Sequence, residues 1–117
     1  MHNFRELKVW HKSRNLVKEV YQITKSFSKE EVFGLSIQAR RSAVSIPSNI
    51  SEGCGRGTDA QLNRFLDIAQ GSACGLETQM ILSFDLGYIT ESELNEIVLK
   101  INEVQKMIRG FQNSLDI

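Results

Sequence analysis

The sequence is poor in the residues that build cross-linked or metal-bound proteins. It has two cysteines, two histidines and one proline among 117 residues. Cys54 and Cys74 form no C-x-x-C pair, so we expect two reduced thiols, of which Cys54, flanked by two glycines, is the more exposed. Neither His2 nor His11 follows a glutamate by three residues, which excludes the Glu-x-x-His pairs of di-iron bundles. The sequence therefore predicts no metal ion and no cofactor.

The chain also lacks an excess of charge of either sign and a long apolar run. Its 14 Lys and Arg balance 14 Asp and Glu. This balance removes the bulk electrostatic argument for a nucleic-acid partner, although it leaves a local basic patch open. No apolar run approaches the ~20 residues of a membrane-spanning helix, and no signal-peptide segment follows Met1. We expect a cytoplasmic protein without a membrane partner, folded as one domain over residues 1–117.

The motifs of common enzyme classes are missing as well. There is no G-x-x-x-x-G-K-[ST] phosphate loop, zinc spacing or nucleophile elbow. The glycine-rich segment at 53–57 precedes an expected helix and could hold an anion there, but no strand leads into it. Ser45 and Ser48 have no histidine or lysine near them in sequence that would activate a serine. The sequence predicts that the protein is not an enzyme.

What the chain does have is apolar residues at three- and four-residue steps in four segments, which predicts four helices. The first expected helix covers residues 4–26, and the second runs from about residue 29 to the glycines at 53–57. The third covers residues 59–86 and the fourth residues 91–114. Capping boxes mark the starts of the last three at Ser28-x-x-Glu31, Thr58-x-x-Gln61 and Thr90-x-x-Glu93. Short connections and the absence of strand alternation favour an all-α, antiparallel up-down-up-down four-helix bundle.

Several side chains are assigned to the packing faces of these helices. Trp10 and Tyr21 lie on the apolar stripe of the first helix, so we expect them in the core rather than as base-stacking platforms. Ile68 and Phe84 belong to the packing side of the third helix. Between them, Gly71-Ser-Ala-Cys-Gly75 replaces bulk with small residues. Because a glycine costs a helix about 1 kcal/mol relative to alanine, this segment predicts close approach of another helix.

The segment from residue 40 to 57 departs from a plain amphipathic pattern. Pro47 removes the amide that would bond to Ala43, so we expect the second helix to kink near Pro47, or to break briefly at residues 43–46. A row of polar residues runs through the same segment at steps of four, four, three and four, which places them on one helix face. Its members are Arg41, Ser45, Asn49, Glu52 and Arg56.

This polar row has three possible roles. As a structural polar network it would join Arg41, Ser45, Asn49 and Glu52 to Glu77 of the third helix through buried hydrogen bonds and ion pairs. As a nucleic-acid-binding surface it would present guanidinium groups to phosphates, while neutral side chains add donors. The arginines of that surface are Arg40, Arg41, Arg56 and Arg64. Subunit contact is the third role.

The residues that carry a family resemblance span nearly the whole chain. They are Leu7 and Trp10, Glu31-Val-Phe-Gly-Leu35 with Gln38, Arg40-Arg-Ser-Ala-Val-Ser-Ile-Pro-Ser-Asn-Ile-Ser-Glu-Gly53, Arg56, Phe65-Leu-Asp-Ile-Ala69, Gly71-Ser72, Leu76-Glu77 and Leu86-Gly-Tyr88. With these residues the chain resembles the 23S rRNA intervening-sequence proteins, which include the accessory variability proteins of bacterial retroelements. Ser28 and Ser51 depart from the family pattern, where proline and alanine are usual.

The resemblance implies a helical bundle that assembles into a homo-oligomer, with a ring-shaped pentamer as the best-known form. Many members are encoded within bacterial ribosomal RNA genes, which suggests contact with RNA. The retroelement relatives are strongly basic and bind nucleic acid, whereas this chain is neutral.

We therefore expect a non-enzymatic homo-oligomer, a pentamer, that binds RNA or a ribonucleoprotein through Arg40, Arg41, Arg56 and Arg64. The alternative is a structural or adaptor scaffold for a protein partner, without nucleic-acid binding, in which the arginines serve internal and subunit contacts. An enzyme would need a deep pocket that holds Glu52 or Glu77 beside an activating group.

Overall fold

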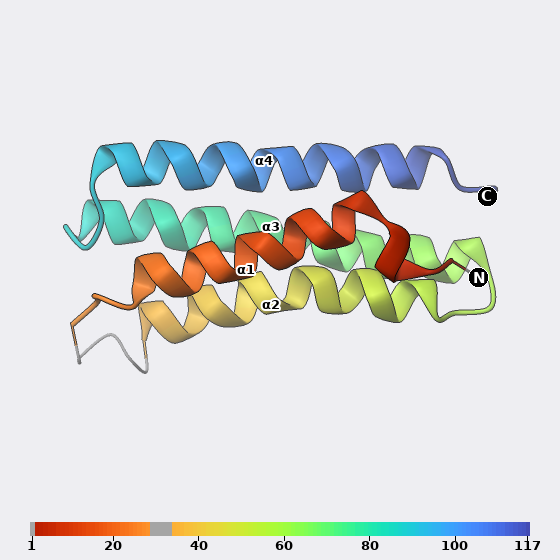
Figure 1. Ribbon diagram of the computed structural model, residues 1–117, viewed down its shortest axis with the longest axis horizontal. Coiled ribbons are helices and arrows are strands. Elements are labelled where there is room, and N and C mark those ends of the chain that lie inside the picture. Colours follow the sequence, from red (N-terminus) through yellow and green to blue (C-terminus); the bar gives the residue numbers. More distant parts are fainter. Residues whose placement is uncertain (1, 29–33) are drawn as a thin grey trace.

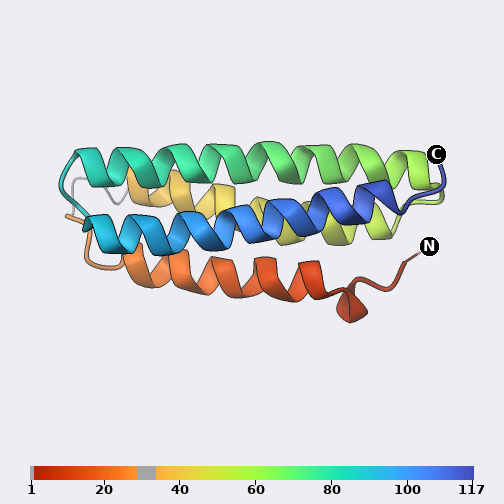
Figure 2. The same cartoon turned by 90° about the horizontal axis from the view of Figure 1, so that it is seen from above.

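The computed structural model describes residues 2–28 and 34–117, and four antiparallel helices make up most of it (Figure 1). The elements are a short 3-10 helix η1 (Phe4–Glu6), α1 (Lys8–Thr24), α2 (Leu35–Cys54), α3 (Asp59–Asp85) and α4 (Glu91–Asn113). Each helix runs opposite to the one before it, along a molecule of 44 × 24 × 20 Å (Figure 2). No strand occurs among the described residues. The predicted all-α up-down-up-down four-helix bundle is confirmed.

The first helix is shorter than predicted, because the chain is extended at Leu7 between η1 and α1. Asn3 caps only η1, through a hydrogen bond from the amide of Arg5 to Asn3 Oδ1 of 3.2 Å. His11 reaches back over this junction, and its Nε2 lies 2.6 Å from the carbonyl oxygen of Arg5. The predicted start at residue 4 therefore holds for a single 3-10 turn, and α1 itself begins at Lys8.

The caps predicted for α3 and α4 are present. Thr58 Oγ1 accepts a hydrogen bond from the amide of Gln61 at 3.2 Å. Thr90 and Glu93 form a reciprocal capping box, with bonds of 2.9 and 3.1 Å. These side chains satisfy amides that a helix start leaves unpaired, which explains why both helices begin where the sequence predicts. The third predicted box, Ser28-x-x-Glu31, extends beyond the described residues.

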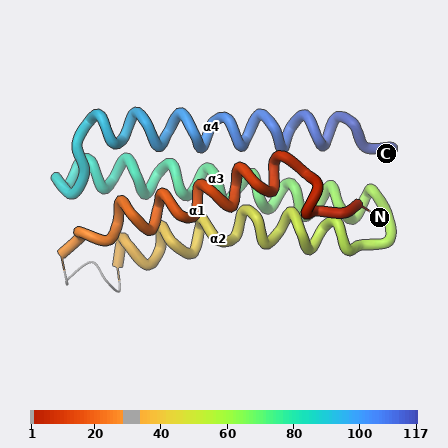
Figure 3. The backbone as a smooth tube through the Cα atoms, in the orientation of Figure 1, coloured from red at the N-terminus to blue at the C-terminus, as the bar shows by residue number. Residues whose placement is uncertain are grey.

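Helix α2 runs from Leu35 to Cys54 with Pro47 inside it, and Figure 3 traces it without interruption. The residues around Pro47 supply local hydrogen bonds: Asn49 Nδ2 donates to the Ser45 carbonyl oxygen at 2.8 Å, and Ser51 Oγ to that of Ser48 at 3.0 Å. The break considered at residues 43–46 is therefore absent. Any bend at Pro47 is accommodated within a continuous helix.

One hydrophobic core fills the space between the four helices. Its large side chains are almost completely buried and come from every helix: Leu16, Val20, Ile46, Ile50, Leu62, Leu66, Leu76, Met80, Ile97, Ile101 and Ile108. A smaller cluster of Phe27, Leu35 and Ile89 closes one end of the bundle, where the rings of Phe27 and Tyr88 stack at 5.0 Å. The three- and four-residue periodicity predicted most of this core.

Four assignments to core or surface were wrong. Tyr21 is 43% exposed, Ile68 51% and Phe84 36%, because each lies at the edge or on the outer side of its helix. Cys54 is buried and Cys74 exposed, the reverse of the expectation. Cys54 ends α2 on the side that faces the core, and this burial raises the pKa of its thiol.

Gly53 has a tight contact with a neighbouring helix, and the glycines of the small-residue segment have looser surroundings. A Cβ atom on Gly53 would lie 2.7 Å from Leu62 Cδ1 and 2.8 Å from Phe65 Cβ. At Gly71 it would meet nothing within 4 Å, and at Gly75 only Ser42 Oγ at 3.8 Å. Gly53 therefore allows the last turn of α2 to contact the first turns of α3.

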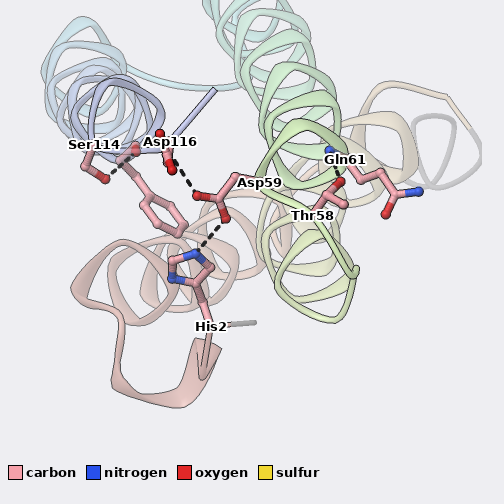
Figure 4. Close-up of polar contacts among 7 residues, drawn as sticks. His2, Thr58, Asp59, Gln61, Ser114 and Asp116 are labelled. Carbon is pink, nitrogen blue, oxygen red and sulfur yellow. Dashed lines mark hydrogen bonds and ion pairs between the residues drawn. The ribbon is translucent and has the colours of Figure 1, made fainter.

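The two ends of the chain meet at the start of α3 (Figure 4). Asp59 Oδ1 lies 3.2 Å from Nε2 of His2, and Asp59 Oδ2 accepts a hydrogen bond from the amide of Asp116 at 3.1 Å. The imidazole of His2 also meets the ring of Phe111 edge-on at 5.4 Å. The Asp116 amide and then His2 lower the pKa of the Asp59 carboxyl. The bundle is thus fastened at the end opposite the Phe27 cluster.

Candidate binding surface on α2 and α3

Two of the five members of the predicted polar network, Ser45 and Asn49, bond to each other and to α3. Ser45 Oγ lies 2.8 Å from Ser72 Oγ, and Asn49 Nδ2 donates to Ser45 Oγ at 2.9 Å. All three side chains are half-buried. The structure therefore brings Ser45 and Asn49 together, with Ser72 of α3 as the partner across the helix contact.

Arg41 and Glu52 lie outside this group, since both are exposed and neither forms an ion pair among the described residues. A helix turns by about 100° per residue, so a row with steps of four and three drifts around the axis and spans about 80°. Ser45 and Asn49 fall on the side toward α3, whereas Arg41 and Glu52 fall on the outer edge. The sequence spacing placed them on one broad face but could not resolve this drift.

Glu77 belongs to a different polar group, between α3 and α4. Its Oε1 accepts a hydrogen bond from Asn102 Nδ2 at 2.9 Å. Asn102 also donates to Gln105 Oε1 at 2.9 Å, and Gln70 donates to the Gln105 carbonyl oxygen at 2.9 Å. Glu77 therefore binds an amide on α4, and not an arginine on α2.

Arg40 is held against α1. Its guanidinium lies 4.6 Å from the centre of the Tyr21 ring, and its Nε donates to Thr24 Oγ1 at 2.9 Å. The hydroxyl of Thr24 in turn donates to the carbonyl oxygen of Val20 at 2.7 Å. Arg40 thus stacks on an aromatic ring and joins α2 to α1, which leaves it half-buried.

The other three predicted arginines are exposed: Arg41, Arg56 and Arg64. The guanidinium of Arg56 lies 4.7 Å from the centre of the Phe65 ring, which orients it without neutralising its charge. Within the described chain none of the three has a carboxylate at ion-pair distance. Arg41 lies 13 residues before Cys54, the last residue of α2, which is about 20 Å along the helix axis at 1.5 Å per residue, and Arg56 lies beyond that helix. Arg56 and Arg64 therefore lie near the connection between α2 and α3, and Arg41 lies toward the other end of α2. We call these three residues the arginine row.

The surface also has shallow grooves. The larger, of about 620 Å³, lies between α3 and α4 and is lined by Cys74, Leu99 and Arg109 among others; neither Glu52 nor Glu77 lines it. No group of three or more His, Cys, Asp or Glu in the described ranges is arranged to hold a metal ion. Those ranges also contain no helix with the length and apolar character needed to cross a bilayer.

A second groove, of about 380 Å³, lies between α1 and α2 and includes two cations that the sequence interpretation overlooked, Arg14 and Lys18. The guanidinium of Arg14 lies 5.4 Å from the centre of the Trp10 ring. The available signal was the four-residue spacing from Trp10 to Arg14 to Lys18, which places all three on one side of a helix.

Comparisons with known proteins agree with this architecture. The chain is similar to a solved structure from Bacteroides thetaiotaomicron, described as a protein with unknown function from the S23 ribosomal protein family. The TM-score is 0.80 at 25% sequence identity, over 91% of this chain and 99% of that one. No curated protein matches. The family model of the 23S rRNA-intervening sequence protein matches residues 5–110. The chain therefore belongs to the family of 23S rRNA-intervening sequence proteins.

Proposed function

We propose that the protein binds RNA, as a homo-oligomer, through the exposed arginines Arg41, Arg56 and Arg64 on α2 and α3. The observation that carries the proposal is that these three guanidinium groups are exposed and have no carboxylate partner among the described residues. Guanidinium groups match phosphate oxygens in geometry and charge, and contacts to phosphates position a protein on a nucleic acid. Arg40 supports the row by fixing α2 against α1.

Because the single chain has no net charge, the proposal includes assembly of several copies. One chain has 14 basic and 14 acidic residues, so three arginines alone give weak, salt-sensitive binding. A homo-oligomer repeats the arginine row, and binding of one row to an RNA raises the effective concentration of the others. We propose a pentamer, and structured ribosomal RNA or a ribonucleoprotein as the partner. The proposal includes no catalytic step.

Fluorescence anisotropy with a labelled, structured fragment of ribosomal RNA tests the proposal across a salt series. We expect the triple variant R41Q/R56Q/R64Q to weaken binding, and to reduce the slope of log affinity against log salt by about 0.7–0.9 for each phosphate that the protein no longer neutralises. The control is K106Q/R109Q on α4, compared with the double variant R56Q/R64Q; it removes the same number of exposed cations from another surface and should leave the slope unchanged.

Each possible outcome tests a different part of the proposal. No affinity of the wild-type protein, even at low salt, would rule out the RNA role and favour a scaffold for a protein partner. Equal weakening in the triple variant and the control would retain RNA binding but reject the α2–α3 site. Circular dichroism of each variant establishes that the helical content is unchanged.

A further inference from the structure

The four helices divide into a basic layer and an acidic layer. Helices α1 and α2 together carry six Lys and Arg against two Glu. Helices α3 and α4 carry four Lys and Arg against eight Asp and Glu. The two pairs of helices of the neutral chain therefore carry opposite net charge, +4 on α1 and α2 and −4 on α3 and α4.

The basic layer contains an apolar groove with free cations at its edge. Trp10, Val17, Val44 and Pro47 contribute its apolar lining, and Arg14 and Lys18 lie beside them. Val44 is 40% exposed although it is a branched apolar side chain. Two other cations of α1 and α4 are already paired, in Lys12–Glu103 and Lys100–Glu19, whereas Arg14 and Lys18 have no carboxylate partner in the described chain.

The acidic layer contains a group of exposed apolar residues at the C-terminal end of α3, which we call the α3 tip. Its residues are Ile81, Leu82, Phe84, Asp85 and Leu86. The four apolar members are between 36% and 62% exposed, which makes the tip the densest group of exposed apolar side chains in the described chain. At 100° per residue Ile81, Leu82, Asp85 and Leu86 fall within about 140° of the helix circumference, so these four share one outward side, and Phe84 lies at its edge.

We propose that the α3 tip of one copy docks into the α1–α2 groove of a second copy. Apolar side chains of the tip cover Trp10, Val17 and Val44, and Asp85 lies against Arg14 and Lys18. The proposal rests on the homo-oligomer proposed above and deepens it by naming both contact surfaces.

A second copy fits this groove because the chain itself carries the complementary surface. Each side supplies exposed apolar side chains, and the charges at their edges are opposite in sign, which favours one orientation of contact. The two surfaces are different, so the contact is head-to-tail and every bound copy still offers a free groove or a free tip. Such contacts continue until they close into a ring or extend as a filament. Symmetric pairing of two acidic or two basic layers would instead place like charges together.

Charge reversal tests the contact with the full-length chain. We expect R14E/K18E in the groove, or D85K at the tip, each to raise the concentration for half-assembly by roughly tenfold or more, because like charges replace the attraction. The combined variant R14E/K18E/D85K restores opposite charges in every copy and should return assembly toward wild type. The control K106E/R109E makes the same charge change on α4 as the groove variant. Sedimentation velocity over a concentration series measures all five proteins.

The outcomes distinguish this contact from oligomerisation in general. Weakening by both changes, rescue by their combination and no effect of the control support the proposal. A wild-type oligomer that neither R14E/K18E nor D85K weakens would overturn the tip–groove contact and retain the homo-oligomer. A wild-type protein that stays monomeric at all concentrations would overturn both. Circular dichroism excludes unfolding as the cause, and L82S/L86S at the tip provides a second disruption without a charge change.

Discussion

The α2–α3 contact and the α1–α4 contact each pack two neighbouring helices together, but they use different residues to do so. Helices α2 and α3 place four alanines in the core, Ala39, Ala43, Ala69 and Ala73, and meet closely at Gly53. Helices α1 and α4 fill the core with leucine, valine and isoleucine, and add two ion pairs near the surface. Small residues bring backbones together and leave no spare volume, whereas exposed ion pairs tolerate change. The α2–α3 contact should therefore be the sensitive one.

The sharpest test of that comparison is Gly53→Ala. Its Cβ atom would approach Phe65 Cβ to 2.8 Å, and because that atom is next to the backbone of α3 the helices must shift. Overpacking of this kind costs about 1–3 kcal/mol in the free energy of unfolding. Urea denaturation measures it. The matched control is Gly71→Ala, which meets nothing within 4 Å and should stabilise α3 by about 0.5–1 kcal/mol. Equal effects at both glycines would contradict close packing at Gly53.

A smaller effect is expected from Ser45→Ala, which removes the hydrogen bond to Ser72 and one acceptor of Asn49. The net contribution of such bonds is about 1 kcal/mol; Ser72 loses its partner across the helix contact, whereas Asn49 keeps its bond to the Ser45 carbonyl oxygen. Thermal unfolding followed by circular dichroism is a suitable measurement. Ser48→Ala, on the exposed side of the same helix, is the control and should be nearly neutral. A destabilisation at Ser48 as large as that at Ser45 would argue against a specific link between α2 and α3.

The smallest effect belongs to the α1–α4 contact. The side chains of Lys12 and Glu103 are 55% and 49% exposed at an N–O distance of 2.8 Å. Exposed pairs of this type are worth about 0.2–1 kcal/mol and weaken as salt rises. A double-mutant cycle of K12A and E103A, measured at low and high salt, should give a coupling energy within this range that falls with salt. A coupling energy larger than that of Ser45 with Ser72 would reverse the ranking of the two contacts.

Helix positions were predictable because capping and periodicity are local. Thr58 and Thr90 bond to amides three residues away, and the buried face of α4 follows its own repeat. Predictions failed where the outcome depended on a neighbouring helix. Cys54 is buried because α2 reaches the core at its last turn, and Ile68 and Phe84 are exposed because each belongs to a broad apolar stripe that extends past the area its neighbours cover.

In the candidate site, too, local spacing was predictable and contacts with a neighbouring helix were not. The spacing of Arg41, Ser45, Asn49 and Glu52 placed them on one broad helix face, but only the position of α3 decided which of them bond and which stay exposed. The partner of Glu77 is Asn102, 25 residues away on another helix, and no local pattern identifies it. Arg14 and Lys18 became a groove edge only through the packing of α2 against α1.

The sequence by itself determined four helices, their order and most of their buried faces, because hydrogen bonding, capping and hydrophobic periodicity act over a few residues. The tertiary structure decided which polar groups pair, which arginines remain free and where the apolar groove and the α3 tip lie. Those features depend on the distance and rotation between helices, which side-chain packing across the whole bundle sets.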